Sequence, residues 1–361
     1  MAHIGIAGAG VLGRLLAWQL AQAGHQVGVF DPAPNEQART DGRGAAGFTA
    51  AGMLSPLAEL ENGGPEVARL GWRSLALWRG ITARLAEAGG AAPWFQQRGS
   101  LLVAHGSDLG TAERVLARLQ DPRAADAPAP QALTHETLAE IEPSLAPQLR
   151  AWLLPGEGQL LPPQLLPALC QAASRVQWHW GRCADAVQPG RITLAGGRAL
   201  NFDLAIDTRG LGGRPELPVR GVRGEVVHLH APGVPLQRPV RLIHTRHRVY
   251  LVPRPGDVIV LGASELESDD RSPVSLRSAV ELMAAAHSVI PELAEARIVH
   301  LETNLRPALP DNQPHTHIEP GLLRINGLFR HGWLLAPALV EDALATLGLG
   351  VLAPTPAAQH A

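Results

Sequence analysis

The chain has 361 residues, 46% of them apolar, and a formal net charge of −2, which predicts a large hydrophobic core divided between two domains. All 31 of its Lys+Arg residues are arginines, so no lysine can form a Schiff base or hold a phosphate in a Walker-type loop. The absence of a long basic run argues against nucleic acid as a partner, and the two cysteines, Cys170 and Cys183, are too few for a disulfide framework and favour a cytoplasmic protein.

The first 31 residues follow the order strand, glycine turn, helix, strand and acid that binds a dinucleotide. An apolar run leads into the motif GAGVLG at residues 8–13, a helical pattern continues to residue 23, and Asp31 closes the next apolar run. Gly8 permits the tight turn, Gly10 lets the backbone approach a pyrophosphate, and Gly13 lets helix and strand pack closely. We therefore predict a dinucleotide-binding βαβ unit in which Asp31 holds ribose hydroxyls.

Helices and short strands alternate over residues 49–207. The small residues TAAGML at 49–54 stand where a helix should begin and leave room for a flat ring system, although a tightly packed helix start would use the same residues. We expect helices at 66–88, 111–120 and 164–174, a proline- and alanine-rich loop at 121–130, and strands at 101–104, near Trp152, and at 177–180, 191–194 and 204–207.

Residues 221–305 change character, with strands expected at 224–230, 247–252, 258–262 and 298–305 and a helix at 275–289. This pattern predicts a mostly antiparallel sheet that carries a substrate site. A strand at 322–326 and a helix from Gly332, interrupted by charges and therefore buried rather than in a membrane, return to the first domain. The predicted division is a nucleotide-binding domain (1–88, 146–218 and 306–352), a substrate domain (89–145 and 219–305) and a flexible tail (353–361).

Three side chains are suited to bind a small carboxylate ligand. Tyr250 is the only tyrosine and lies in an expected strand, Arg306 follows a strand, and Arg330 precedes the last helix. Guanidinium groups match carboxylates as rigid forks, and a phenol can donate a further hydrogen bond. A lone arginine is, on the other hand, usually a solvated surface charge.

The turn LFRHGW at 328–333 leads into the last helix at Gly332, so backbone amides and the positive end of a helix dipole point to the expected position of the cofactor. His331 could face that cofactor or cap the helix. Histidines at 228 and 230, and at 315 and 317, pair on strand faces, but no third ligand is evident and we expect no metal ion.

A family resemblance rests on the motifs GAGVLG, TAAGMLSPLAELE, VRGEVVHL, RPVRLIHTRHRVYLVPR, VIVLGASELES, NLRP and INGLFRHGWLLAP. Through them, nearly the whole chain resembles the glycine oxidases of the D-amino acid oxidase superfamily, the type associated with thiamine-thiazole synthesis. This resemblance implies an α/β fold of the GR2 flavoprotein type, with a discontinuous Rossmann-like domain that binds FAD noncovalently beside an antiparallel-sheet substrate domain. It places around FAD the residues Gly8, Gly10, Val11, Leu12, Gly13, Asp31, Ala46, Gly47, Ala51, Gly52, Met53, Ala184, Gly210, Leu328, Phe329, Arg330, His331, Gly332, Trp333 and Leu334.

The resemblance further implies oxidation of glycine or a similarly small amine to the imine and then glyoxylate and ammonia, with O2 reduced to H2O2. Arg306 would pair with the substrate carboxylate while Tyr250 and Arg330 hold it, and the neutral amine would need no protein base. A thiazole synthase and a second copy of the chain are the macromolecular partners to consider. Two alternatives stay open: an FAD-dependent D-amino acid or sarcosine-type dehydrogenase or oxidase, and a non-catalytic flavin-binding protein.

Two segments depart from the family pattern. Gly327-Leu328 stands where many members have Gly-His, and DTRGLGGR at 207–214 replaces the usual Gly-x-Trp-Ser. The change at Gly327-Leu328 would affect the edge of the flavin ring. The change at 207–214 would affect contacts with the pyrophosphate or with the flavin. Neither removes a residue expected to bind a carboxylate.

Overall fold

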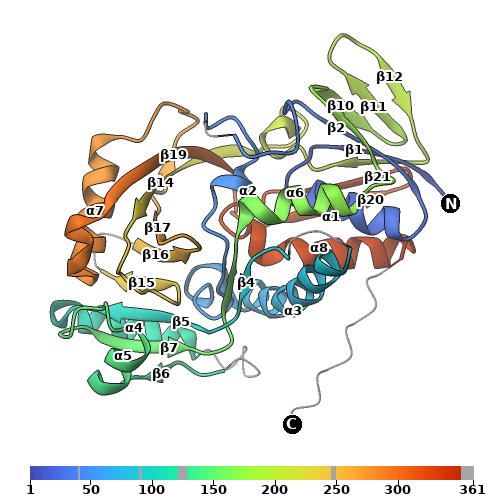
Figure 1. The fold of residues 1–361 in the computed structure, drawn as a ribbon. Helices are drawn as coiled ribbons and strands as arrows, with labels where there is room; N and C mark the ends of the chain where they lie inside the picture. Colours follow the sequence, from blue (N-terminus) through green and yellow to red (C-terminus); the bar gives the residue numbers. More distant parts are fainter. Residues whose placement is uncertain (40, 89–91, 121–127, 245–248, 351–361) are drawn as a thin grey trace.

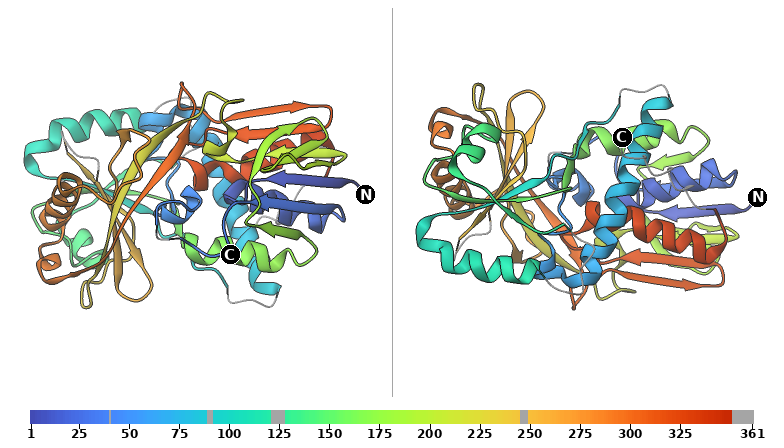
Figure 2. Two further views of the ribbon diagram at one scale, coloured as in Figure 1. Left: turned by 90° about the horizontal axis from the view of Figure 1, so that it is seen from above. Right: turned by 90° about the horizontal axis from the view of Figure 1, so that it is seen from below.

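Two large sheets lying side by side organise the computed structural model, which describes residues 1–350 apart from 40, 89–91, 121–127 and 245–248 (Figure 1). Views from above and below place the six-stranded sheet beside the N-terminus and the nine-stranded sheet at the opposite end (Figure 2). The expected tail at 353–361 and most of the loop at 121–130 lie outside the described residues.

The glycine motif lies at the centre of the six-stranded sheet, whose order is β20-β21-β13-β1-β2-β9. Its strands are β1 (His3–Ala7), β2 (Gln26–Asp31), β9 (Gln177–Trp180), β13 (Leu204–Asp207), β20 (His315–Glu319) and β21 (Leu322–Asn326). β1 pairs in parallel with both β2 and β13, and only β20 at the edge is antiparallel. Because three distant stretches of chain supply these strands, the nucleotide-binding sheet is discontinuous in sequence, as expected.

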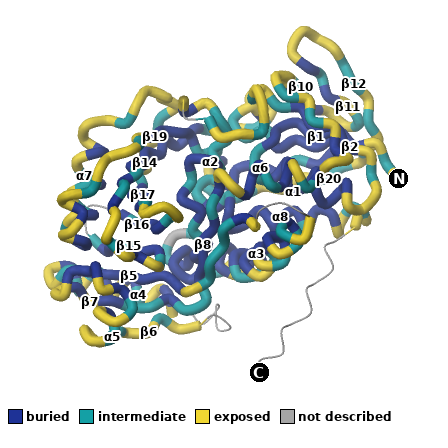
Figure 3. Tube along the Cα trace, viewed as in Figure 1, coloured by how far each residue is buried: buried dark blue, intermediate teal, exposed yellow. Residues whose placement is uncertain are grey.

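Both faces of this sheet are covered, which explains why its central strands β1, β2 and β13 are almost continuously apolar (Figure 3). Ile4 and Ile6 pack with helices on one face, and Ala7 packs with a small sheet on the other. The helices are α1 (Val11–Gln22), α3 (Leu60–Glu87), α6 (Pro162–Ala172) and α8 (Gly332–Leu347), and the small sheet contains β10 (Ala184–Gln188), β11 (Arg191–Leu194) and β12 (Ala199–Asn201). Helix α3 starts earlier than the sequence predicted and bends at Gly64, whose φ is +76°.

The second sheet has nine strands and is antiparallel except where β5 pairs with β15. Its strands are β5 (Ser100–Ala104), β6 (Gln131–Ala132), β7 (Arg150–Leu154), β14 (Arg220–His230), β15 (Val240–Ile243), β16 (Val249–Arg254), β17 (Val258–Gly262), β18 (Leu266–Glu267) and β19 (Arg297–Ala308). Helix α7 (Leu276–Val289) packs on β14, β16 and β17, and α4 (Leu109–Leu119) and α5 (His135–Ile141) lie near β5 and β7 (Figure 1).

Three local predictions are wrong because pairing between distant strands decides them. The strand near Trp152 is β7, which pairs with β5 and β6 and therefore belongs to the nine-stranded sheet, not to the nucleotide-binding part. Residues 49–54 do not begin a helix: α2 (Ala46–Thr49) ends there, and β3 (Met53–Leu54) pairs with β8 (Gly158–Leu160), which also pairs with β4 (Phe95–Gln96). Arg306 lies within β19 rather than after it.

Candidate cofactor and substrate site

A cavity of about 1460 Å³ extends from the glycine turn after β1 to the face of the nine-stranded sheet that carries Tyr250 and Arg306. Every residue that the sequence placed around the cofactor or the substrate lines this cavity, with the exception of Gly13. The described part of the chain has no helix long and apolar enough to cross a membrane.

The glycines of the turn after β1 have two different roles, one in backbone packing and one in leaving space in the cavity. A Cβ atom on Gly13 would lie 1.9 Å from the Gly8 carbonyl oxygen, and one on Gly8, whose φ is +98°, would lie 2.6 Å from the Thr208 carbonyl oxygen. These two glycines are required by backbone packing. A Cβ on Gly10 would meet only the Ala45 methyl group at 4.0 Å, so the space beside Gly10 faces the cavity at the start of α1. An open backbone at a helix N-terminus fits a pyrophosphate.

Asp31 ties the glycine turn to the end of β2. One carboxylate oxygen accepts from the Ala9 amide at 2.6 Å and the other from the Ala33 amide at 2.8 Å. Each oxygen has a further lone pair, and the residue is only partly buried in the wall of the cavity. The carboxylate can therefore bind ribose hydroxyls without losing its backbone partners.

Arg14 lies buried beneath this turn and has a positive charge that the sequence analysis did not use. It is 1% exposed, and it donates to the carbonyl oxygens of Ala9 at 2.7 Å and Glu36 at 2.9 Å. Its guanidinium lies over the rings of Phe48 and Trp180, and no described carboxylate is within ion-pair distance. Burial lowers its pKa from the ordinary value, but arginine remains charged.

The turn before α8 is fixed to β19. Phe329 has a positive φ of 48°, unusual for a residue with a side chain, and its amide donates to the Pro307 carbonyl at 2.9 Å. The Trp333 indole donates to the Gly47 carbonyl at 2.9 Å, which joins α8 to α2 across the cavity. Because α8 begins at Gly332, its first amides have no partner within the helix and can serve a ligand in the cavity.

The segment at 51–53 is held by an arginine that sequence reasoning missed. Arg254 at the end of β16 donates to the carbonyl oxygens of Ala51 and Leu160, and burial lowers its pKa to about 10. A Cβ on Gly52, whose φ is +68°, would lie 2.3 Å from the Leu160 carbonyl oxygen. The small residues here thus let the backbone approach β8, and they line the cavity as expected.

The remaining cofactor candidates lie along the same wall. Gly210 accepts a hydrogen bond from the Asn326 side chain at 2.9 Å, and Ala184 accepts one from Arg209 at 3.0 Å. Arg209 in turn pairs with the buried Asp207 at 2.9 Å, so the unusual DTRGLGGR turn is braced by its own ion pair. Val11, Leu12 and Ala46 also line the cavity.

Arg306 provides a guanidinium without a carboxylate partner at the other end of the cavity. It donates to the carbonyl oxygens of Ser264 at 3.1 Å and Arg223 at 3.4 Å, and no ion pair joins it to a described acid. Burial lowers its pKa, opposed by Tyr250 and Glu265. A cation with backbone partners on one side and no counter-ion is suited to an external carboxylate.

Tyr250 lies on the same wall, over Gly262 of the neighbouring strand. A Cβ on Gly262 would come within 2.4 Å of the phenol oxygen, so the glycine makes room for the ring. Burial raises the pKa of Tyr250, and Arg306 and Arg330 only partly oppose this. The phenol therefore stays protonated at neutral pH and can donate a hydrogen bond.

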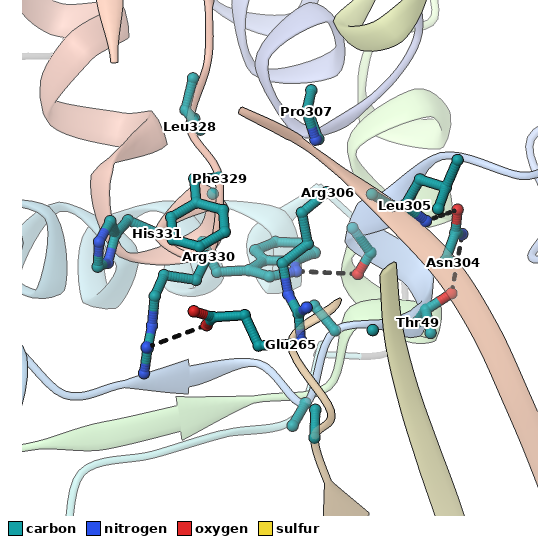
Figure 4. A pocket seen from close by; sticks show the side chains of 18 of the residues that line it. Thr49, Glu265, Asn304, Leu305, Arg306, Pro307, Leu328, Phe329, Arg330 and His331 are labelled. Carbon is teal, nitrogen blue, oxygen red and sulfur yellow. Dashed lines mark hydrogen bonds and ion pairs between the residues drawn. The ribbon is translucent and has the colours of Figure 1, made fainter. Parts of the chain in front are cut away.

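Arg330, unlike Arg306, already has acidic partners. Its guanidinium lies 3.4 Å from Glu265 and 3.5 Å from Glu59, and Figure 4 shows the Glu265 pair directed into the cavity between Arg330 and Arg306. Glu59 is 5% exposed and also accepts from Arg241 at 3.0 Å. Burial alone would raise the pKa of Glu59, but Arg330, Arg241 and His331 together lower it to about 2.

Sequence reasoning did not single out Glu59, Arg241 or Glu265. All three lie within motifs that carried the family resemblance, and Arg241 lies opposite Tyr250 in the antiparallel pairing of β15 with β16. The resemblance motif and this register are the two signals that could have placed Arg241 on the substrate wall. His331, next to Glu59 at 3.6 Å, is buried, and burial lowers its pKa.

The two histidine pairs make different ring contacts, and the rings of His315 and His317 stack with their centroids 6.4 Å apart. His228 contacts the ring of His300 on β19 rather than completing a site with His230, and among the described residues no group of three histidine, cysteine or acidic side chains could hold a metal ion.

Comparisons with known proteins find a family model, relatives and a solved structure that match almost the full chain. Residues 3–343 match the family model described as FAD dependent oxidoreductase. The chain is 36% identical over 337 residues to a Rhizobium etli protein named for the thiamine biosynthesis oxidoreductase ThiO, covering 93% of each. It is 28% identical to the bifunctional protein ThiO/ThiG of Nostoc, covering 94% of this chain and 52% of that one. The crystal structure of glycine oxidase from Geobacillus kaustophilus superposes with a TM-score of 0.82 at 26% identity, covering 99% of this chain and 97% of that one. The chain belongs to the FAD-dependent oxidoreductase family.

Proposed function

We propose that this protein is an FAD-dependent oxidase of glycine or a similarly small amino acid. The observation that carries the proposal is the guanidinium of Arg306, which has no acidic partner among the described residues and lies beside a protonated Tyr250 in the same cavity as the dinucleotide turn. An amino acid is the simplest substrate that has both a carboxylate for Arg306 and an oxidisable carbon one bond away. The likeness to ThiO and to glycine oxidase supports glycine as that substrate.

The residues along the cavity fit FAD, as judged by the open space at Gly10 and the free amides of α8. Gly8 to Leu12 would hold the pyrophosphate, Asp31 the adenosine ribose, and the 328–334 turn the ring system. Bound FAD supplies the two-electron acceptor for the carbon–hydrogen bond and passes the electrons to O2. The protein contributes position: Arg306 binds the carboxylate, and Tyr250 donates a further hydrogen bond.

Arg330 has a different role from Arg306 in this proposal. Because Glu59 and Glu265 already pair with it, Arg330 contributes less net positive charge to an incoming carboxylate. It shapes the wall and adds a donor, while Arg306 provides the charge. The substrate amine loses its proton to solvent before oxidation, and no side chain is assigned as a base.

The second candidate is oxidation of a secondary amine or a D-amino acid, with or without O2 as the acceptor. The same carboxylate anchor favours it, because Arg306 and Tyr250 would bind sarcosine as readily as glycine. We further propose that the product serves a thiazole synthase, as the fused ThiO/ThiG relative suggests, and that the enzyme works in the cytoplasm.

The test is the visible spectrum of the purified holoenzyme, mixed anaerobically with glycine and then exposed to air. Loss of the oxidised-flavin absorbance, followed by its return with release of peroxide, is the expected result. If the flavin stays oxidised with glycine but is reduced by sarcosine or a D-amino acid, that amine replaces glycine as the proposed substrate. A flavin that no amine reduces would overturn the proposal of an amine oxidase.

A further inference from the structure

We propose that Glu265 is a specificity-determining residue that restricts the site to amines with a single carboxylate. This inference rests on the proposed function, since it concerns the substrate class of the same site. It starts from an asymmetry between the two arginines drawn on either side of Glu265 in Figure 4: Arg330 has two acidic partners, and Arg306 has none among the described residues.

Glu265 occupies the position from which one carboxylate can act on both guanidinium groups. It follows Ser264, whose carbonyl oxygen holds Arg306 at 3.1 Å, and its own carboxylate lies 3.4 Å from Arg330. Its side chain is 50% exposed and lines the cavity, so it meets an incoming ligand directly. The negative charge of Glu265 is thus part of the surface that a substrate contacts.

Glu59 cannot have this role. It is buried behind Arg330 and is shared among Arg330, Arg241 and His331, so its charge is matched by its own neighbours. Glu59 pairs with Arg241 and Glu265 pairs with Arg330, so of these three arginines Arg306 alone has no carboxylate partner among the described residues and can bind an external carboxylate. A second carboxylate on the substrate would have to displace Glu265 from Arg330 or lie beside a like charge, and both cost binding free energy.

Two pairs of compounds isolate the second carboxylate. Sarcosine and iminodiacetate are secondary amines that differ only by that group, and acetate and malonate are the corresponding acids that are not oxidised. We would measure kcat/KM for the two amines, and dissociation constants for the two acids from perturbation of the flavin spectrum, at constant ionic strength. The variants are Glu265→Gln and Glu265→Ala. The matched control is Glu267→Gln, which removes a carboxylate that pairs with Arg220 at 2.8 Å outside the cavity.

We expect both Glu265 variants to raise the preference for malonate over acetate, and for iminodiacetate over sarcosine, by roughly five- to tenfold, the size of one partly screened charge pair. The change should appear in KM rather than kcat, and Glu267→Gln should leave both ratios unchanged. Ratios that do not move in either Glu265 variant would overturn the inference, whether or not glycine is oxidised. If no amine is oxidised but the malonate preference still rises, the charge selection by Glu265 stands and the proposed function fails.

Discussion

The guanidinium of Arg306 fills the space that a side chain at Gly224 would need. An added Cβ at Gly224 would lie 2.6 Å from three atoms of that guanidinium, while the backbone there has an ordinary φ. The conflict is therefore with the end of a flexible side chain and not with the fold. Gly224 thus sets where the carboxylate anchor lies.

Gly224→Ala should displace Arg306 and raise the KM for glycine about tenfold or more, with the flavin still bound and the melting temperature nearly unchanged. Arg306→Ala should raise KM further, because it removes the charge altogether. The double variant should be no worse than Arg306→Ala alone, since both changes act through one side chain. Additive losses in the double variant would show that Gly224 acts by another route.

Tyr250→Phe tests the phenol as a donor to the substrate carboxylate. Loss of one hydrogen bond to a charged group should lower kcat/KM for glycine by about ten- to a hundredfold. Because the ring still packs over Gly262, stability and flavin content should be retained. Steady-state kinetics on the holoenzyme measures the effect, and an unchanged kcat/KM would remove Tyr250 from the substrate site.

The sequence predicted those features that neighbouring residues determine. Strands 204–207 and 322–326 were predicted with their observed bounds, because a buried strand is marked by its own apolar run and the turns around it. The cavity-lining residues around GAGVLG and LFRHGW were also found, because their turn geometry is local.

Features set by strand pairing could not be predicted in the same way. Trp152 was assigned to the wrong sheet, since no local pattern says which distant strand β7 will join. Arg241 is an ordinary charge in its own segment and reaches the site only through its register with Tyr250. Glu59 likewise resembles a surface acid in its own segment, but in the fold it is buried against Arg330 and Arg241.

Arg14→Met tests the buried charge beneath the glycine turn. The variant keeps an unbranched, apolar side chain at this position but removes the hydrogen bonds to Ala9 and Glu36 and the positive charge near the expected pyrophosphate. We expect the apoenzyme to bind FAD at least about tenfold more weakly, measured by quenching of flavin fluorescence, while flavin-saturated enzyme keeps its KM for glycine. Arg84→Met, which removes an arginine lying over Trp18, one turn further along α1, is the control. Equal FAD affinity in the two variants would contradict this role.

Glu59 should give the protein a stability that depends on pH in the acid range. Its pKa is lowered from 4.5 to about 2 in the folded protein, so the unfolded chain binds the proton more tightly than the folded one. The stabilisation is therefore fully present above about pH 4.5 and is lost as the pH falls toward 2, with a total on the order of 3 kcal/mol. Urea unfolding of wild type and Glu59→Gln at several pH values measures it. The wild type should be the more stable protein at pH 6, and the gap should narrow between pH 4.5 and 2. A gap that stays constant over that range would mean that the charge of Glu59 is not what stabilises the arginine cluster.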